Sequence, residues 1–399
     1  MTPTTVQDAA SIDPFDLEFL ENPHTFHAML RDAAPVVRLE KYGVYAMARY
    51  AEVHAALVDW QSFQSAAGVG LSNFRNEKPW RPPSVLLEAD PPRHDAPRAV
   101  VAPLLTTRRL RDLEDQWRAD AATLVAELLE RGTAFDAVTD LAEVFPLRVF
   151  PDAVGIGKVG RENLLPYGDF AFNAFGPANE LVTSASPHMP PVTEWIGRQT
   201  LRENLTDDGF GAQIWAAADR GEITPEQAPM IVRSLLTAGV DTTVTGIAAI
   251  MHALAHTPGS VARLRRDRHL TRTAFEEAVR LTSPVQTFFR TATRDIRVGD
   301  ALIHDGEKIL MFLGSANRDP RRWDDPDVFD LDRDPSGHVA FGMGIHQCVG
   351  QHIARLEAIC VLDALLDRIV DIEPAGPERR HLNNTLVGWE SMPVRVTLG

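Results

Sequence analysis

Apolar side chains recur every three or four positions through the middle of the chain, from about residue 96 to residue 280, among many Ala, Glu and Arg. This period is typical of helices that bury one face. Short strand-like runs occur in residues 35–50, around a Tyr42-Gly43 turn, and in residues 295–313, around Asp305-Gly306. The last residues, 391–399, also read as a strand. The pattern predicts a mostly α fold with small β-sheets.

The distribution of turn residues predicts one continuous unit. The chain has 399 residues, more than the ~100–200 typical of a single domain. No internal repeat, low-complexity tract or long Gly/Ser linker divides it, and Pro and Gly are scattered as turn punctuation. We therefore expect a single domain over residues 1–399.

One long helix is the most informative element of the pattern. Residues 224–227, TPEQ, combine a capping Thr, a Pro at the first helical position and a Gln that can close a capping box. Helical spacing continues to residues 257–259, TPG, which predicts one helix of about 30 residues that crosses the molecule. Gly239, Asp241 and Thr242 lower the helix propensity in its middle. Such residues in a helix interior favour a functional role over a tolerated polar kink.

Composition and charge exclude several classes of protein. Hydrophobic residues make up 44% and charged residues 24%, which is ordinary globular usage rather than that of a fibrous or disordered chain. Lys and Arg number 40 against 55 Asp and Glu, so the formal charge is −15. That acidic excess argues against a protein that grips nucleic acid.

The N-terminal segment and the cysteines indicate a soluble, cytoplasmic protein. Asp8, Asp13 and Asp16 lie where a secretion signal would need a basic flank and an apolar run. The longest weakly polar stretch, residues 242–255, is shorter than the ~18–20 residues of a membrane helix. Because the chain has only two cysteines, a disulfide framework is excluded and a reducing compartment fits. We expect no membrane and no nucleic-acid partner.

Cys348 stands in a glycine-rich loop. Gly342, Gly344 and Gly350 surround it, and the apolar spacing of a helix begins at or just after it. Unpaired amides and the dipole at a helix N-terminus favour a thiolate over a thiol. Glycines let backbone N–H groups approach the sulfur and let a flat partner lie close to the chain. This pattern predicts a metal-bound thiolate, whereas Cys360, on the apolar stripe of the following helix, is expected to be a core residue.

Other roles for Cys348 stay open at this point. A structural zinc site needs four ligands, and the nearby His346 and His352 lack the usual paired spacing. A cysteine nucleophile, as in a hydrolase, would need an activating His and an orienting Asn or Asp from elsewhere in the fold. An inert buried cysteine would leave the three glycines unexplained.

Residues 341–350, FGMGIHQCVG, resemble the haem-binding loop of the cytochromes P450. Two further family motifs appear in order. Residues 238–243, AGVDTT, resemble the oxygen-activating stretch of the family's central helix, and residues 277–280, EAVR, resemble its ExxR motif. Segments 35–50 and 316–333 also match the family. The resemblance covers essentially the whole chain, and the length is that of the soluble bacterial members.

This resemblance implies the cytochrome P450 fold, with haem b (iron protoporphyrin IX) between the long central helix and the helix after the cysteine loop. Cys348 is then the axial thiolate of the haem iron, whose electron donation favours O–O cleavage. Phe341 and Gly342 belong to the loop that holds the haem. Glu277 and Arg280 are expected to form a structural triad, with Arg333 as the third member in this chain.

The resemblance also assigns partners for the haem propionates, which are anions and need cations or hydrogen-bond donors. His94 and Arg98, four residues apart and so on one helix face, match the family's propionate-binding helix. Arg290 and His338 match the other propionate partners.

Oxygen activation is assigned to the middle of the central helix. Thr242 is expected to donate a hydrogen bond to reduced oxygen and Asp241 to relay protons from solvent, while Gly239 leaves room for O2. The implied reaction inserts one oxygen atom of O2 into a C–H bond. In such enzymes the cofactor carries the difficult chemistry and the protein positions and protonates.

Four segments match the family's substrate-facing positions: residues 81–90, 169–179, 231–239 and 283–289. Their mixture of flat apolar and polar side chains suits an aromatic body with an anionic end. They resemble the bacterial subfamily that oxidises para-substituted benzoates, including O-demethylation of 4-methoxybenzoate, although Thr237 stands where close relatives tend to have serine. The expected substrate contacts are Arg81, Ser84, Phe172, Phe175, Arg233, Ser234, Thr237, Val285 and Phe288.

These features predict a haem-thiolate monooxygenase of small aromatic carboxylic acids, acting by O-demethylation or hydroxylation of para-substituted benzoates. A P450 that tailors a larger natural product is the same-fold alternative. A non-catalytic haem sensor or binding protein is the alternative of another class. Asp241 and Thr242 speak against a sensor, because a sensor has no need for proton delivery.

Electrons are expected from separate proteins, since these residues include no flavin or ferredoxin domain. The resemblance implies a reduced iron–sulfur ferredoxin with its NAD(P)H-dependent reductase. A formal charge of −15 would repel an acidic ferredoxin, so a basic patch is expected on the thiolate side of the haem. Its candidates are Arg108, Arg109, Arg111 and Arg355. A monomer is expected.

Overall fold

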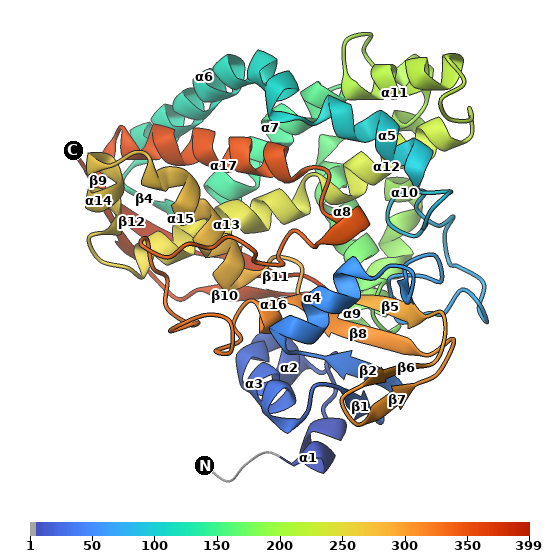
Figure 1. Cartoon of the computed structure of the whole chain (residues 1–399). Coiled ribbons are helices and arrows are strands. Elements are labelled where there is room, and N and C mark those ends of the chain that lie inside the picture. Colours follow the sequence, from blue (N-terminus) through green and yellow to red (C-terminus); the bar gives the residue numbers. More distant parts are fainter. Residues whose placement is uncertain (1–4) are drawn as a thin grey trace.

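Helices fill one side of the molecule and the principal sheet lies on the other (Figure 1). The structure is a computed structural model and describes residues 5–399. Helix α17 (Gln351–Leu366) packs against α6 (Thr107–Arg131), α13 (Asp241–Ala255) and α15 (Leu270–Thr282). These four helices surround the largest buried core of the protein.

Each of these helices buries one face, as the apolar spacing predicts. In α6, Leu110, Trp117, Leu124 and Leu128 are at most 3% exposed. The helix begins after Thr106, whose hydroxyl accepts a hydrogen bond from the backbone N–H of Arg109. Burial of each large apolar side chain contributes ~1.5–3 kcal/mol, so tertiary packing rather than helix propensity stabilises α6.

The central helix is interrupted where the sequence predicts a continuous one. Helices α12 (Gln227–Ala238) and α13 follow one another across the molecule, with a break at Gly239 and Val240 (Figure 1). The hydroxyl of Thr242 donates to the carbonyl of Ala238 at 2.8 Å. A side chain that bonds a carbonyl one turn back bends a helix. The prediction of an unbroken helix was therefore wrong at the very residues expected to carry function.

The two ends of this helical span agree with the sequence. The backbone N–H of Thr224 donates to Oε1 of Gln227 at 2.9 Å, as the capping box predicts. Among residues 5–399, Gln227–Ala255 is the one helical span long and apolar enough by composition to cross a membrane. However, 67% of its most apolar window is buried inside the protein, which is the environment of a core helix.

The principal sheet has five strands in the order β1-β2-β8-β5-β3. Strand β8 is parallel to β2 and antiparallel to β5. The predicted turns are present, since Gly43 and Gly306 have φ angles of 63° and 84°, which glycine adopts readily. The strands are β1 (Val37–Leu39), β2 (Val44–Met47), β3 (Phe63–Gln64), β5 (Thr287–Ala292) and β8 (Lys308–Phe312).

Smaller sheets complete the β part. The predicted C-terminal strand is β12, which lies between β4 and β9. The other two sheets are the pairs β6-β7 and β10-β11. These strands are β4 (Ala134–Asp136), β6 (Ile296–Val298), β7 (Ala301–Ile303), β9 (Ile369–Pro374), β10 (Arg379–Leu382), β11 (Val387–Ser391) and β12 (Pro393–Leu398).

The remaining helices are mostly short and connect these layers. The α-helices are α1 (Val6–Ala10), α2 (Leu17–Glu21), α3 (Pro23–Ala33), α4 (Tyr50–Val58), α5 (Asp95–Leu104), α7 (Val144–Val154), α8 (Leu164–Asn173), α9 (Glu180–Ala185), α10 (Met189–Gln199), α11 (Phe210–Asp219), α14 (Ser260–Arg266) and α16 (Leu313–Ala316). Single turns of other helix types are η1 (Val138–Ala142), η2 (Arg161–Asn163), η3 (Ser186–His188), η4 (Arg202–Asn204) and η5 (Gly344–His346). The mostly α fold with small β-sheets is thus confirmed. A single domain over residues 1–399 stays a prediction, and residues 1–4 lie outside the described residues.

Candidate active site

Cys348 lies in a tight loop three residues before the first residue of α17. Its backbone N–H donates to the carbonyl of Phe341 at 2.8 Å, which closes the loop. Gly342 and Gly344 have φ angles of 65° and 69°, a region that disfavours other residues. A Cβ atom on Gly344 would also lie 2.7 Å from the carbonyl oxygen of Leu57. The glycines therefore fix the loop that presents the sulfur.

The helix end alone does not favour a thiolate at Cys348, contrary to the expectation from the sequence. Burial raises the pKa of this thiol, and it outweighs the opposing effect of the Gly350 amide and the positive charge of Arg98. A thiol in this position needs a bound cation to ionise at neutral pH. Cys360 is a buried core residue of α17, as predicted, and neither cysteine forms a disulfide.

A cavity lies between the central helices and the cysteine loop. Its volume is about 250 Å³, and it is lined by side chains of α12, α13, β5, the cysteine loop and the segment from Arg81 to Leu87. Cys348, Thr242 and Gly239 all reach it. Its lining is mostly apolar with a few polar side chains, which is typical of small-molecule sites.

Three arginines without acidic partners among the described residues line this cavity: Arg98, Arg290 and Arg233. Arg98, on α5, donates to the carbonyl of Gln347 at 2.7 Å, and Arg290, on β5, donates to the carbonyl of Phe289 at 2.9 Å. Within residues 5–399, no carboxylate lies within ion-pair distance of any of the three guanidinium groups. Burial lowers the pKa of Arg290 to about 10, so it stays protonated at neutral pH. Buried cations of this kind favour an anionic group in the cavity.

Two histidines adjoin these arginines. The ring centroids of His94 and His346 are 4.8 Å apart, and Nε2 of His346 lies 3.0 Å from a carboxylate oxygen of Asp90. Nε2 of His94 is buried and has no hydrogen-bond partner. Burial lowers the pKa of both rings. His346 lines the cavity but was not predicted, although the loop motif itself contains it two residues before Cys348.

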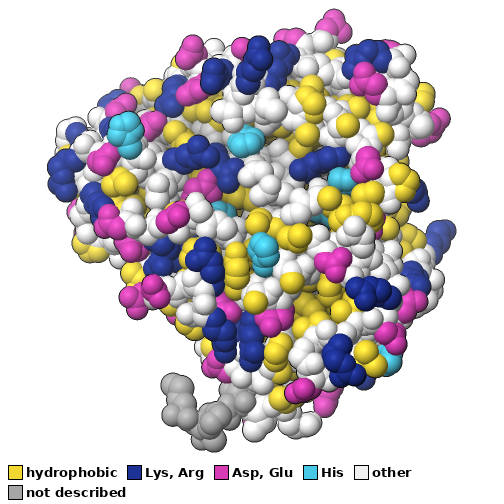
Figure 2. Space-filling model, viewed as in Figure 1, with side chains coloured by type: hydrophobic (Ala, Val, Ile, Leu, Met, Phe, Trp, Pro, Cys, Tyr) yellow, Lys and Arg dark blue, Asp and Glu magenta, His cyan; other side chains and the backbone are white. Residues whose placement is uncertain are grey.

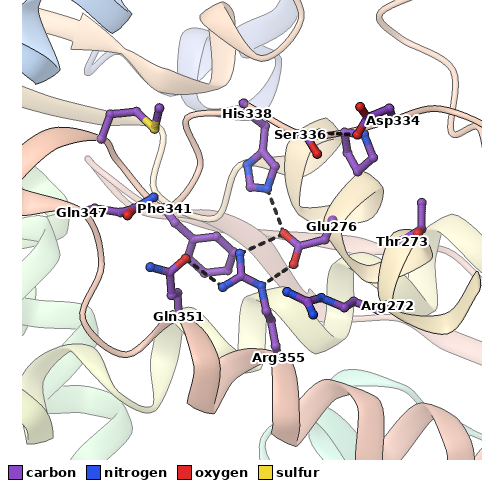
Figure 3. Close-up of a pocket in the computed structure, with 13 residues that line it drawn as sticks. Arg272, Thr273, Glu276, Asp334, Ser336, His338, Phe341, Gln347, Gln351 and Arg355 are labelled. Carbon is purple, nitrogen blue, oxygen red and sulfur yellow. Dashed lines mark hydrogen bonds and ion pairs between the residues drawn. The ribbon is translucent and has the colours of Figure 1, made fainter. Parts of the chain in front are cut away.

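Neither His94 nor His338 lines this cavity: the His94 ring packs against that of His346, which does line it, whereas His338 lies elsewhere. Its Nε2 lies 3.0 Å from Oε2 of Glu276, in a separate hollow outside the cysteine loop (Figure 3). Arg355 joins the same carboxylate, and its guanidinium carbon lies 4.6 Å from the centre of the Phe341 ring. The predicted residues Phe341 and Gly342 do line the cavity. His346 therefore joins the candidate propionate partners, and the role expected for His338 stays a prediction.

The predicted triad is present and buried. Arg280 donates two hydrogen bonds to Glu277, of 2.7 and 2.8 Å, and Arg333 donates a third of 2.8 Å to the same carboxylate. Arg280 also donates to the carbonyls of Asn317 and Pro326. Because both charges are fully buried, loss of one partner would leave the other uncompensated, which costs ~3–5 kcal/mol. The triad anchors the segment before the cysteine loop.

Asp241 and Thr242 begin α13 at the helix break. Thr242 lines the cavity, whereas Asp241 turns toward α8, where a Cβ atom on Gly168 would lie 2.2 Å from its Oδ2. That oxygen is buried and has no hydrogen-bond partner. Burial, reinforced by the nearby carboxylate of Asp169, raises the pKa of Asp241 well above its usual range. Asp241 therefore keeps its proton to a higher pH than an exposed aspartate does.

A route toward the surface adjoins Asp241. The carboxylate of Asp169 accepts a hydrogen bond of 2.7 Å from Asn383 and lies 2.6 Å from Nε2 of His381. The His381 ring is 40% exposed. Burial opposes protonation of His381, but the ion pair with Asp169 outweighs it and raises the pKa of the ring. None of these three residues was singled out from the sequence, because they meet only through the packing of α8 against β10 and the loop after it.

All nine predicted substrate contacts line the same cavity. Phe172, Phe175 and Phe288 form its aromatic wall, with successive ring centroids 5.9 and 6.0 Å apart and edge-to-face angles of 85° and 64°. Val285 adjoins them. The sequence could not predict that Leu86, Leu87 and Phe150 also line the cavity, because their spacing does not separate cavity walls from ordinary core.

The polar part of the lining is internally paired. The hydroxyls of Ser84 and Ser234 lie 3.2 Å apart, and the guanidinium of Arg81 forms a 2.9 Å ion pair with Glu88. Arg233 donates to the carbonyl of Pro82 at 2.8 Å and has no acidic partner within the described part of the chain. Thr237 donates its hydroxyl to the backbone carbonyl of Arg233 at 2.8 Å, so its methyl group is the part free to face a ligand.

The residues around Cys348 fit a haem on the evidence of their own chemistry. The Cys348 sulfur, Arg98 and Arg290 line one cavity, and beside it lies a His94 nitrogen without a hydrogen-bond partner. A metalloporphyrin with two carboxylates would supply a metal ion for the sulfur and carboxylate oxygens for the arginines and the histidine. A structural zinc does not fit, because the one group of three candidate ligands within 4.8 Å of one another, among residues 5–399, lies elsewhere.

Comparison with known proteins agrees with this fit. The cytochrome P450 family profile matches residues 197–388. The chain is 56% identical to "Cytochrome p450 CYP199A2" of Rhodopseudomonas palustris over 386 residues, which are 97% of this chain and 94% of that protein. The chain belongs to the cytochrome P450 family, and it is a haem-dependent monooxygenase.

More distant relatives span similar lengths. "Beta-dihydromenaquinone-9 omega-hydroxylase" of Mycobacterium tuberculosis is 31% identical over 96% of this chain and 78% of its own length. Among solved structures, cytochrome P450 CYP109Q5 from Chondromyces apiculatus superposes with a TM-score of 0.81 at 31% identity, covering 98% of this chain and 99% of that one. Cytochrome P450 CREJ in complex with (4-ethylphenyl) dihydrogen phosphate gives 0.87 at 25% identity, covering 98% and 100%.

Proposed function

We propose that this P450 inserts one oxygen atom of O2 into a C–H bond of a small aromatic carboxylic acid, by O-demethylation or hydroxylation of para-substituted benzoates. One observation carries the proposal: an aromatic wall and a pair of hydroxyls line the same cavity as Cys348 and Thr242. Haem, when bound, supplies the activation of O2.

Cys348 is the proposed thiolate ligand, and the metal cation would reverse the effect of burial on its pKa. Arg98, Arg290 and His94, together with His346, are the proposed partners of the propionates. Their side chains come from α5, β5 and the cysteine loop, so one anionic group would hold three separate segments together.

Asp241 and Thr242 are the proposed proton carriers. Asp241 holds a proton near Gly168 and α8, and Thr242 presents its hydroxyl at the cavity wall. His381 and Asp169 would exchange that proton with solvent. A carboxyl with a raised pKa keeps a larger protonated fraction and so can donate a proton more often, and proton donation is what the reduction of O2 to the level of water requires.

The aromatic wall supports an aromatic substrate. Phe172, Phe175 and Phe288 offer ring faces and edges that bind a benzene ring in the geometry aromatic pairs prefer. The CREJ structure was solved with a para-substituted phenyl phosphate, a flat ring with an anionic group opposite an alkyl group. The same division of a ligand into an apolar and an anionic end suits this cavity.

The anionic end of the substrate would bind the hydroxyl pair of Ser84 and Ser234, with Arg233 as the nearby unpaired charge. Arg81 is less suitable than the sequence suggests, because Glu88 already neutralises it. Each charge-assisted hydrogen bond contributes ~1.5–3 kcal/mol, which is roughly a ten- to hundredfold difference in affinity between an acid and its neutral analogue.

The test is a titration of the low- to high-spin shift of the haem with 4-methoxybenzoate and 4-methoxybenzamide. We expect the acid to bind more tightly by that factor, and Ser84→Ala to remove most of the difference. Thr237→Ser is the matched control, because it keeps a hydroxyl and should leave the ratio unchanged. Equal affinity for acid and amide in the unaltered protein would refute the carboxylate hypothesis and leave the monooxygenase class intact.

A P450 that tailors a larger natural product remains the second candidate. It is favoured by the 31% identity to the "Beta-dihydromenaquinone-9 omega-hydroxylase" of Mycobacterium tuberculosis. Absence of any spin shift with 4-methoxybenzoate, combined with a shift for a bulky polycyclic or isoprenoid ligand, would favour this candidate.

The proposed electron donor is an iron–sulfur ferredoxin with its NAD(P)H-dependent reductase. Arg108, Arg109 and Arg111 are exposed near the start of α6. Figure 2 shows basic side chains on this face over α6, interspersed with acidic ones. Arg355 is no longer a candidate, because it is bonded to Glu276 and is only 13% exposed. We propose that Arg272, exposed at the rim of the same hollow, takes its place.

We propose further that the protein works as a cytoplasmic monomer. The two unpaired cysteines motivate the location. Gel filtration of the haem-loaded protein tests the monomer, and a mass of about 88 kDa, twice the chain mass of 44.0 kDa, would contradict it.

A further inference from the structure

A second cluster of metal-binding side chains lies at the far end of α13, apart from the haem cavity. His252 and His256, four residues apart on one helix face, approach Glu378, which directly precedes β10. The two imidazole rings stack with their centroids 4.2 Å apart. All three side chains reach solvent, with exposed fractions of 32%, 44% and 22%. None of them lines the cavity that contains Cys348.

The distances in this cluster are those of ligands around a common ion. Nε2 of His252 lies 3.4 Å from Oε2 of Glu378, and Nε2 of His256 lies 3.5 Å from Oε1. Short hydrogen-bonded ion pairs have separations of ~2.7–2.9 Å. Two atoms that are each ~2.0–2.1 Å from a tetrahedral metal lie ~3.4 Å apart. The observed separations match the second arrangement.

The proton on His256 can be placed from its surroundings. Nδ1 of His256 lies 3.0 Å from the backbone carbonyl of His252, and a carbonyl can only accept, so Nδ1 carries the proton. In the neutral ring, Nε2 then directs a lone pair at the carboxylate of Glu378. Oε1 of that carboxylate is buried and has no hydrogen-bond partner. Two facing acceptors require a cation between them, either a proton or a metal ion.

Neighbouring groups hold the candidate ligands in place. The Trp389 ring stacks on His252, with centroids 4.5 Å apart, and its Nε1 donates to Oε2 of Glu378 at 3.2 Å. Trp389 belongs to β11, which pairs with β10 at Arg380. Metal sites need such outer contacts, because they orient the first ligands and set the tautomer of each histidine.

We propose that His252, His256 and Glu378 bind a zinc ion, with water as the fourth ligand. Two imidazoles and one carboxylate are a ligand set that zinc accepts in tetrahedral geometry. The ion joins the end of α13 to the β10-β11 pair, and therefore stabilises the contact between the central helix and a sheet distant from the haem. This site is independent of the proposed substrate.

The test uses the haem-loaded protein, prepared without a histidine tag, so that iron already occupies the thiolate. The protein is incubated with zinc, dialysed against metal-free buffer, and its zinc and iron are measured by mass spectrometry. We expect one zinc per iron in the unaltered protein and a loss of zinc in His256→Gln and Glu378→Gln. His304→Gln is the matched control, because His304 is an exposed histidine that lies 3.3 Å from Asp295.

A second measurement separates binding from misfolding. Added zinc should raise the melting temperature of the unaltered protein and of the His304 variant, but not of the other two variants. Iron content and the visible spectrum of all variants should stay the same. Zinc absent from the unaltered protein, or retained equally in His256→Gln, would show that the cluster is only a protonated imidazole paired with a carboxylate, and would overturn the proposal.

Discussion

A Cβ atom placed on Gly168 would lie 2.2 Å from Oδ2 of Asp241, so the absence of a side chain on α8 makes room for the carboxyl at the helix break. Gly168→Ala should therefore displace Asp241 and weaken proton delivery, while Cys348 and the aromatic wall stay in place. We expect several-fold more hydrogen peroxide per NAD(P)H consumed in the reconstituted system.

The matched control for this change is Gly197→Ala. Gly197 also lies in a helix, α10, but a Cβ atom there meets nothing within 4 Å. Product yield per NAD(P)H should be unchanged in the control. Equal yields in both variants would mean that the position of Asp241 does not limit the amount of product formed per NAD(P)H.

Thr242→Ala should keep haem and substrate binding but raise the fraction of reducing equivalents lost as hydrogen peroxide, by about tenfold if proton delivery is worth ~1.4 kcal/mol. Thr242→Ser retains a hydroxyl and should stay close to the unaltered protein. The hydroxyl also donates to the carbonyl of Ala238, so a melting curve accompanies the assay to exclude a general loss of structure. A peroxide ratio unchanged in Thr242→Ala would remove this residue from the proton route.

Cys348→Ala should abolish the red-shifted absorption band that a thiolate-ligated ferrous haem gives with carbon monoxide. Cys360→Ala should keep that band and lose about 1 kcal/mol of stability or less, because Cys360 is a small core residue of α17. The reverse pattern would show that the wrong cysteine has been assigned.

The pH dependence of stability should change in Glu357→Gln. Glu357 lies on α17, both of its carboxylate oxygens are buried without hydrogen-bond partners, and burial raises its pKa well above the usual range. A raised pKa in the folded state contributes stability below the unfolded value, ~4.3, and that contribution is lost as the pH rises through the folded value. Glutamine stays neutral at every pH.

The variant should therefore gain stability relative to the unaltered protein as the pH rises from about 5 to about 9. Between the pKa of Glu357 in the unfolded state and its pKa in the folded state, the gain is at most ~1.4 kcal/mol for each pH unit. Urea unfolding of both haem-loaded proteins at three pH values measures the difference. A difference that stays constant across this range would mean that Glu357 is ionised in the folded protein or bonded to water.

The cysteine loop and the buried triad could be predicted because each is tied to a local motif with fixed spacing. The nine expected substrate contacts, which came from the family resemblance of four segments, do line the cavity, and their contact with substrate stays a prediction. The sequence did not predict the break at Gly239, since the hydroxyl of Thr242 reaches a carbonyl one turn back only after the helix has formed. It left His346 out of the propionate partners, because only the folded loop shows that this imidazole lines the cavity while His338 lines the neighbouring hollow.

Charge neutralisation was the other property hidden from the sequence. Arg81 and Glu88 are seven residues apart, and nothing in their spacing indicates that they form an ion pair. That ion pair makes Arg81 less suitable as the partner of an anionic substrate. Likewise, the raised pKa of the Cys348 thiol depends on how completely the loop is buried, which local pattern does not report.

Strand β5 contributes to two neighbouring parts of the cavity at once. Phe288 belongs to the aromatic wall, and Arg290 is one of the arginines that line the cavity without an acidic partner. Residues two apart on a strand point to the same face. The register of Phe288 and Arg290 is fixed by pairing with Met311 and Ile309 of β8. A shift of β5 that reshapes the aromatic wall also moves Arg290. Evolution of this enzyme toward new substrates is therefore less constrained in α8 and in the segment before α5 than in β5.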